Sequence, residues 1–488
     1  MTTSQLLEID FSSGRSGSGP ATWGQRAVWE AVRRLPAADA PRYNVAAGSA
    51  LDPGMPLPRV LDALRHLLHL HDSLHTRLAP GADGGLRQVV DPAGRLPVHT
   101  RVWEPGAGPV DPAAAGESLH RELTDRAFDC AREWPLRIGL VLVDGLVRYV
   151  SLVLSHTAVD GAGLGLLVLD FAALSRGETP EQLLARRGPT QQPLEEAEFQ
   201  TSERGRRRDA AARDHLLRKL RLGPPRLFPE PSDLGADPSR RFPNAVLRSP
   251  ALAVALEQVA ARHRVSSASV LLAAAGALTA RLSGRSEAVL QVVVNNRFLP
   301  GLGCAVSTVA GEGLFHLTDA GGGSGGSAAF GEVLRRVHGA AFAVYRHAYY
   351  DRVALDAQLA ALAADGIVSA DRSCVFNDLR DLVPAALAGS GPEPAGTEAG
   401  TETEARAETE TGTETETETG AEDDDGATTL SWPVEFEPRP GLTYALDVAR
   451  SGSALSLSMT ADSTVLPRAE MARFLYGMEQ LIVREATA

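Results

Sequence analysis

Strand-like aliphatic runs alternate with helical patterns along most of the chain, and this alternation narrows the possible folds more than any other feature. The stretch 136–154, "LRIGLVLVDGLVRYVSLVL", reads as a hairpin, because Asp144 and Gly145 form a tight turn between two runs rich in valine and leucine. A helical pattern follows at 162–175. The second half repeats the theme, with two helices within 249–284, each opened by a serine that can cap it, before a buried strand. Interleaved strands and helices predict an α/β or α+β protein.

Length and composition limit the number of domains and the cellular compartment that we can expect. A chain of 488 residues exceeds one ordinary hydrophobic core, which favours two domains or two similar lobes. Its 3 cysteines are few and widely spaced, which argues against a disulfide framework or a zinc site and indicates a reducing compartment, so we expect a cytoplasmic protein. The first residues lack the pattern of a secretory signal, and the longest apolar runs are too short to span a bilayer. No membrane role is predicted.

An acidic tract accounts for almost all of the chain's net charge. Residues 391–426 contain thirteen acidic side chains and one arginine, so they carry −12 of the formal charge of −13. A segment with so few apolar residues and so much like charge cannot bury enough surface to offset its ordering entropy, which predicts disorder. Because strand and helix patterns resume after it, the tract is an insertion in a loop. The overall pI therefore identifies no partner.

These patterns give a predicted domain organisation. We expect a flexible N-terminus over 1–19, a first lobe over 20–185, an interlobe helix and linker over 186–245, and a second lobe over 246–488. The disordered acidic insertion within the second lobe is placed at 386–429.

The motif "SHTAVDG" lies where the second strand of the hairpin ends, and it carries the candidate chemistry. An imidazole at His156, facing a cleft, can accept or orient a proton from an attacking amine or hydroxyl. Asp160 is better suited to anchor the loop, since a buried carboxylate paired with an arginine would hold the imidazole in place. Gly161 would permit a sharp entry into the following helix. A motif this short is weak by itself, and a structural histidine is the simple alternative.

Further motifs occur in the order of a known family. "TWGQRAVW", Tyr43–Asn44, "HDSLHTRL", "FDCAREWPLRIGLVLVDG", "SHTAVDG", "VVVNNRFLPGLGCAVSTV" and "SCVFNDL" together resemble the condensation domains of nonribosomal peptide synthetases. That family belongs to a superfamily with acyltransferases similar to chloramphenicol acetyltransferase. The resemblance runs from about residue 22 to the C-terminus, apart from the acidic tract.

The resemblance implies a fold and a set of site residues. It implies two chloramphenicol acetyltransferase-like lobes, each an α+β sandwich, in a V-shaped pseudo-dimer with an active-site tunnel between them. His156 takes the position of the family's important histidine, and Asp160 that of the motif aspartate, whose partner should be Arg297. Ser155 stands where the family has its first, mainly supportive histidine. Asn377 is a further candidate for a polar group that faces the histidine from the second lobe.

Simpler interpretations remain for the less distinctive residues. Arg297 would otherwise be a solvated arginine at a strand end, and Asn377 a turn-forming residue. The basic run 204–222, "RGRRRDAAARDHLLRKLRL", is best explained as the solvated face of an interlobe helix. A docking surface for an acidic carrier protein is a second reading of this run, and nucleic-acid binding is disfavoured because no aromatic residues are interleaved.

The predicted activity is acyl transfer. The resemblance implies that an acyl or aminoacyl group moves from the phosphopantetheine thioester of an acyl or peptidyl carrier protein to an amine, which forms an amide in natural-product biosynthesis. No metal or redox cofactor is implied, because phosphopantetheine enters as part of the substrate. One alternative is an ester-forming transferase with a hydroxyl acceptor, for which His156 must act as a true general base. The other is a non-catalytic recruitment module, an idea prompted by Ser155.

Overall fold

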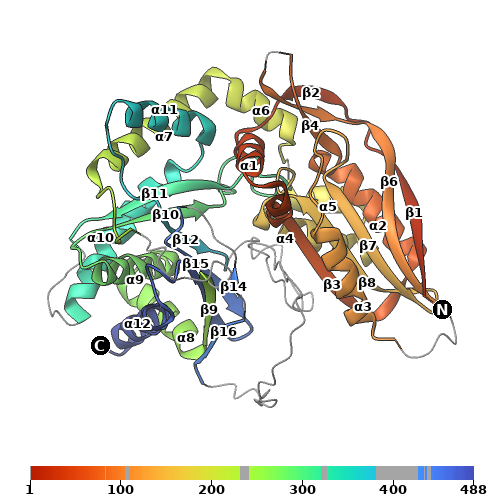
Figure 1. Cartoon of the computed structure of the whole chain (residues 1–488). Coiled ribbons are helices and arrows are strands. Elements are labelled where there is room, and N and C mark those ends of the chain that lie inside the picture. Colours follow the sequence, from red (N-terminus) through yellow and green to blue (C-terminus); the bar gives the residue numbers. More distant parts are fainter. Residues whose placement is uncertain are drawn as a thin grey trace.

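The computed structural model describes two sheet-based lobes joined by a helical connection (Figure 1). The described residues are 2–82, 84–104, 110–188, 190–230, 241–319, 327–380, 427–433, 435–436 and 441–488. All but the last three residues of the predicted acidic insertion 386–429 lie outside them.

The first lobe contains a five-stranded sheet in the order β1-β6-β7-β8-β3, in which only β6 and β7 are parallel. Its strands are β1 (Thr2–Ser12), β3 (Asn44–Pro56), β6 (Ala93–Trp103), β7 (Leu136–Val143) and β8 (Leu146–Ser155). Alternate residues of β7 enter different cores. Ile138 and Leu140 pack with helices α2 (Leu57–Leu70) and α4 (Gly161–Ser175), whereas Val141 packs with α3 (Pro112–Thr124).

The predicted hairpin and its helix are confirmed. Asp144 and Gly145 connect β7 to β8 with φ values of 52° and 76°, the left-handed conformation that a two-residue hairpin turn requires. Helix α4 begins directly after the loop that follows β8.

The N-terminus differs from the prediction. We expected residues 1–19 to be flexible, but β1 pairs with β6 along its whole length, and β2 (Gly17–Pro20) joins a small sheet with β5 (Leu86–Val90) and β4 (Thr76–Pro80). Alternation in "LLEIDF" explains why, because Ile9 and Phe11 point into the core and are 0% and 4% exposed.

The second lobe contains a larger sheet in the order β11-β10-β12-β15-β16-β9-β13, and a short strand, β14, also pairs with β9. Strands β10, β12 and β15 run parallel to one another. The strands are β9 (Phe242–Ser249), β10 (Ala288–Val294), β11 (Gly311–Leu317), β12 (Cys374–Asp378), β13 (Thr429–Ser431), β14 (Glu435–Phe436), β15 (Tyr444–Ser451) and β16 (Ala454–Ala461).

Four helices cover one side of this sheet, as Figure 1 shows: α8 (Pro250–His263), α9 (Ser267–Leu282), α10 (Ser327–Arg346) and α12 (Arg468–Thr487). Both predicted serine caps are present. The Ser249 hydroxyl accepts from the Leu252 backbone N–H at 3.0 Å, and the Ser266 hydroxyl accepts from that of Ser269 at 3.2 Å. Among the described residues, no single helix is long and apolar enough to cross a bilayer. Helices α8 and α9 reach that length only as a pair bent by 104°.

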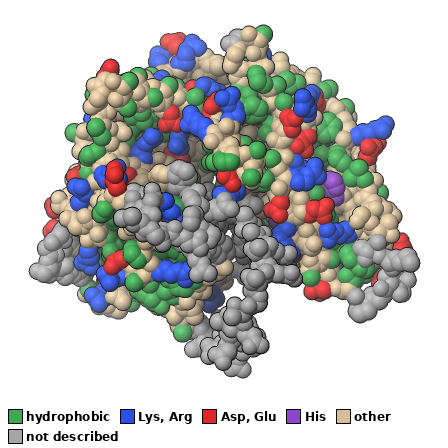
Figure 2. All heavy atoms as spheres, in the orientation of Figure 1, with side chains coloured by type: hydrophobic (Ala, Val, Ile, Leu, Met, Phe, Trp, Pro, Cys, Tyr) green, Lys and Arg blue, Asp and Glu red, His purple; other side chains and the backbone are tan. Residues whose placement is uncertain are grey.

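Helices α5 (Pro180–Arg187), α6 (Pro193–Thr201) and α7 (Glu203–Leu222) connect the lobes. Helix α1 (Trp23–Arg33), which the 3-10 turn η1 (Ala37–Tyr43) follows in the chain, lies at the same junction, and α11 (Arg352–Ala364) lies beside α7 (Figure 1). The basic run 204–222 forms most of α7, and two of its arginines pair with acids of the same helix, Arg207 with Glu203 and Arg213 with Asp209. On the face shown in Figure 2, basic and acidic side chains are interspersed over both lobes.

A buried histidine in the first lobe makes stability depend on pH. His75 is fully buried, and neither ring nitrogen has a hydrogen-bond partner among the described residues. Burial lowers the pKa of His75, although the nearby Asp72 opposes this shift. The unfolded chain therefore binds the proton more readily, so stability is fully present above the ordinary pKa of about 6.5 and is lost as pH falls below it.

We expect the free energy of unfolding to fall on acidification by up to about 1.4 kcal/mol per pH unit through His75 alone. Urea titrations between about pH 5 and 8 measure how the free energy of unfolding changes with pH. In the variant His75→Gln, the part of this change that comes from His75 should be missing. His69→Gln is the matched control, since His69 is exposed. Equal slopes for wild type and His75→Gln would contradict the prediction.

Candidate active site

His156 lies directly after β8, at the border between the lobes. Its backbone N–H donates to the Tyr43 carbonyl at 3.3 Å, and its carbonyl accepts from the Thr308 hydroxyl of the second lobe. The Tyr43 ring centroid lies 6.4 Å from that of the imidazole. The backbone at His156 is thus held from both lobes, while the side chain remains half-buried.

The two nitrogens of the imidazole have different surroundings. Nδ1 is buried without a hydrogen-bond partner among the described residues. That leaves Nε2 as the ring nitrogen open to a substrate. Within the described parts of the chain, no carboxylate is hydrogen-bonded to this ring, in contrast to the histidine of a catalytic triad.

Asp160 joins the start of α4 to the second lobe. It caps the helix, because its Oδ1 accepts from the Gly163 N–H at 2.7 Å. Its Oδ2 accepts from the backbone N–H groups of Val309 and Ala310 at 3.0 and 2.8 Å. Burial raises the pKa of Asp160, but Arg297 and these backbone donors outweigh burial, so the pKa lies below its usual value.

Arg297 forms the ion pair with Asp160 that the resemblance implies, at 2.7 Å between Nη2 and Oδ1. Both side chains are almost fully buried, with 4% and 3% exposed. Nη2 also donates to the carbonyls of Ala305 and Ser307, at 2.8 and 3.1 Å. The segment between β10 and β11, which we call the crossing segment (residues 295–310), is therefore pinned against the first lobe. The Ser73 hydroxyl adds another tie, donating to the Val306 carbonyl at 2.6 Å.

We predicted that the sharp entry into α4 requires a glycine at position 161, but the structure requires one at position 163 instead. A Cβ added at Gly161 would have no atom within 4 Å, and its φ lies outside the positive range, so a side chain is tolerated there. A Cβ at Gly163 would lie 2.6 Å from Val159 and 3.1 Å from the Arg297 guanidinium. The crossing segment packs this closely on α4 only because residue 163 lacks a side chain.

Ser155 occupies the position of the first motif histidine and belongs to a small polar cluster. Its hydroxyl lies 2.8 Å from the Thr157 hydroxyl and 3.5 Å from the Cys130 thiol. Burial is the main reason that the pKa of Cys130 is raised, so the thiol stays protonated near neutral pH. The cluster supports the end of β8 and brings no second imidazole to His156.

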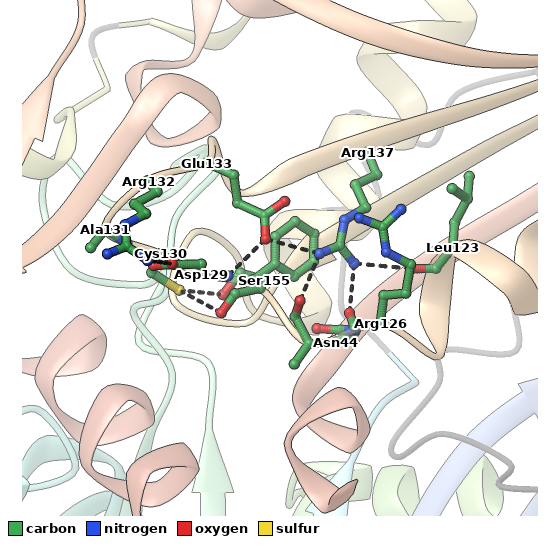
Figure 3. Close-up of polar contacts among 12 residues, drawn as sticks. Asn44, Leu123, Arg126, Asp129, Cys130, Ala131, Arg132, Glu133, Arg137 and Ser155 are labelled. Carbon is green, nitrogen blue, oxygen red and sulfur yellow. Dashed lines mark hydrogen bonds and ion pairs between the residues drawn. The ribbon is translucent and has the colours of Figure 1, made fainter. Parts of the chain in front are cut away.

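Two residues near this cluster, Asn44 and Arg137, hold the end of α3 and the loop that follows it, residues 123–133 (Figure 3). The Asn44 amide donates to the carbonyls of Thr124 and Arg126, at 2.6 and 2.9 Å. The buried Arg137 donates to the carbonyls of Leu123 and Ala127, at 3.1 and 2.8 Å, and stacks on the Phe128 ring. Asn44 is also paired with Ser155 across β3 and β8. The sequence motifs contain both residues but gave no sign of this supporting role.

Asn377 does not join this group. It lies in β12, and its amide donates to Asp447 of the neighbouring strand β15 at 2.9 Å. Among the hydrogen bonds of the described residues, none joins it to His156. Of two cavities in the described part of the chain, one is lined by residues of α7 and α11 and the other mainly by residues of α1 and α6, and His156 lines neither of them.

Comparison with known proteins identifies the family. The model of the Condensation domain family matches residues 37–366, which include the whole arrangement around His156, Asp160 and Arg297. The chain belongs to the condensation-domain family. Condensation domains occur in nonribosomal peptide and polyketide synthases, use carrier-bound substrates and generally catalyse acyl transfer.

Individual relatives are similar at modest identity. The chondramide synthase cmdD of Chondromyces crocatus is 28% identical over 291 residues, which cover 57% of this condensation domain and 7% of the synthase. The solved condensation domain of the Monacolin K polyketide synthase MokA superposes with a TM-score of 0.67 at 17% identity, covering 96% of this chain and 97% of that one. A structure from the enacyloxin polyketide synthase, concerned with chain release by its condensation domain, gives 0.64 at 18% identity, with 97% and 83% covered. The predicted two-lobed, chloramphenicol acetyltransferase-like fold is thereby confirmed.

Proposed function

We propose that this condensation domain transfers an acyl or aminoacyl group from a carrier-protein phosphopantetheine thioester to an amine, forming an amide. The amine attacks the thioester carbonyl, the carbon–sulfur bond breaks, and the sulfur leaves as a thiolate while the amine loses a proton, which is finally passed to the thiolate to give the free thiol. His156 is the proposed catalytic residue, with Nε2 positioned to receive that proton. Asp160 and Arg297 are positioning residues, because they hold the loop and not the substrate.

The surroundings of the His156 ring favour an amine over an alcohol as the acceptor. A strong general base is normally oriented by a partner on its second nitrogen, as in the triad. Here Nδ1 has no partner among the described residues, and every described bond of the Asp160 carboxylate goes to Arg297 or to backbone N–H groups. An amine with a pKa of about 8 needs little help to attack a thioester, whereas an alcohol needs a true general base. The unoriented imidazole therefore supports amide formation over ester formation.

We expect the purified chain to form product from an amine faster than from the matched alcohol by at least about 10²-fold, the lower bound of what a positioned general base contributes. The measurement compares acceptors that differ only in NH₂ against OH, with one acyl group on one carrier protein. Faster ester formation would contradict the amide proposal and retain acyl transfer. If neither product forms with any acyl carrier tested, the recruitment module suggested by Ser155 becomes the better explanation.

A further inference from the structure

A buried carboxylic acid in α6 lies close enough to the Asp160–Arg297 ion pair to feel both charges, and it takes no part in the proposed acyl transfer. Glu196 in α6 is 1% exposed. Its Oε1 accepts from the Tyr349 hydroxyl at 2.8 Å and from the Gln200 amide at 2.9 Å. The same Gln200 nitrogen donates to the Tyr349 hydroxyl at 2.8 Å, which closes a three-membered network.

This network lies where the two lobes and the connecting helices meet. Gln200 also accepts from the Trp23 backbone N–H at 2.8 Å, at the first residue of α1. Tyr349 lies between α10 and α11 of the second lobe, and its ring packs 5.1 Å from that of Trp23. Both rings belong to one small core with Ala305 and Val309 of the crossing segment. The crossing segment thus rests on the Glu196 network on one side and holds Asp160 on the other.

The charges around Glu196 connect the network to the ion pair. The titratable and charged groups that face it are Tyr349, Arg297 and Asp160, and the Arg208 guanidinium lies over the Tyr349 ring. Burial is the largest effect and raises the pKa of Glu196 to about 7, although the Tyr349 hydrogen bond and the charge of Arg297 oppose it. Burial also raises the pKa of Tyr349, so its hydroxyl remains a donor at every working pH.

We propose that Glu196 is a positioning residue whose protonation state sets how firmly the crossing segment is held against the first lobe. With the carboxyl neutral, Oε1 keeps the hydrogen bonds from Tyr349 and Gln200, and Glu196 adds no charge to the junction. With the carboxylate charged, the closed junction carries the cost of a buried charge that forms no ion pair with any described residue, and opening the junction relieves that cost. The loop that carries His156 is then held less firmly.

The direction of the pH effect follows from the two states. In the closed junction Glu196 has a pKa of about 7, and in an open, solvated junction it returns to its ordinary value of 4.5. The stabilisation of the closed junction by protonated Glu196 is therefore complete below about pH 4.5. It is lost as pH rises towards about 7 and changes little above that. Across this window the closing equilibrium weakens by up to about tenfold per pH unit.

Hydrogen exchange tests the proposal without requiring turnover. The amides of Val309 and Ala310 donate to Asp160, so their protection factors, corrected for intrinsic exchange, report how firmly the crossing segment is held. In the full chain we expect protection to fall by up to about tenfold per pH unit between about pH 5 and 7 and then to level off. Glu196→Gln should keep protection independent of pH in this range. Glu198→Gln, an exposed position on the same helix, should behave as wild type.

A second variant, Tyr349→Phe, keeps the proposal testable if Glu196→Gln fails to fold. Tyr349→Phe removes a hydrogen bond that lowers the pKa of Glu196, so the fall in protection should move to higher pH. If the protection of Val309 and Ala310 changed with pH in the same way in wild type, Glu196→Gln and Tyr349→Phe, the proposal would be overturned.

The catalytic readout rests on the proposed function. The pH–rate profile of acyl transfer by Glu196→Gln should lose one inflection near pH 7 that wild type and Glu198→Gln retain. If no acyl transfer is found for any variant, the proposed function fails while the exchange result stands. If the inflection is kept in Glu196→Gln although exchange behaves as expected, the coupling to His156 is wrong.

Discussion

Replacement of His156 by alanine should reduce the rate of amide formation by about 10²-fold, the lower end of what a positioned proton acceptor contributes, because an amine needs less help than an alcohol. The imidazole follows β8 and its Nε2 is open to substrate, so truncation removes the group and leaves the strand and α4 in place. Most of the loss should fall on kcat, because the proton moves in the transition state. Single-turnover rates with a preloaded carrier protein measure the effect.

Two controls make this result interpretable. His69→Ala removes an exposed histidine of the same lobe and should leave the rate unchanged. Thermal melting should show His156→Ala folded, since the side chain is only half-buried. Equal product from wild type and His156→Ala would show that the imidazole is not the catalyst.

Loss of the Arg297 guanidinium should cost stability as well as activity. Arg297→Met should lower the free energy of unfolding by about 3–5 kcal/mol, because the Asp160 carboxylate would remain buried without its counter-charge. Activity should fall too, since the crossing segment and the His156 loop share this ion pair. Urea unfolding gives the stability, and the carrier-protein assay gives the rate.

A charge-free double variant separates the ion pair from simple loss of packing. Asp160→Asn retains a side chain that can cap α4, and together with Arg297→Met it leaves no buried charge. The double variant should therefore be more stable than Arg297→Met alone. Arg95→Met, at an exposed pair with Asp10, should cost no more than about 1 kcal/mol. A double variant as unstable as Arg297→Met would show that charge burial is not the cause.

Local sequence determined the parts of the fold that depend on neighbouring residues. The Asp144–Gly145 turn, the serine caps of α8 and α9, and the helix that follows "SHTAVDG" each form from residues a few positions apart, so pattern and turn chemistry suffice to predict them. The family motifs added the fold and the Asp160–Arg297 pair, whose members lie 137 residues apart and follow from no local rule.

Only the tertiary structure decided the features that depend on contacts between distant segments. The first residues become β1 because an open strand edge of β6 is available to pair with them. Gly163, and not Gly161, meets the crossing segment because the second lobe approaches α4 at that point. Asn377 turns to Asp447 because β15 is its neighbour in the sheet. Glu196 resembles any other acid of a polar helix until the fold buries it against Tyr349, because desolvation is a property of the assembled junction and is not encoded in the adjacent residues.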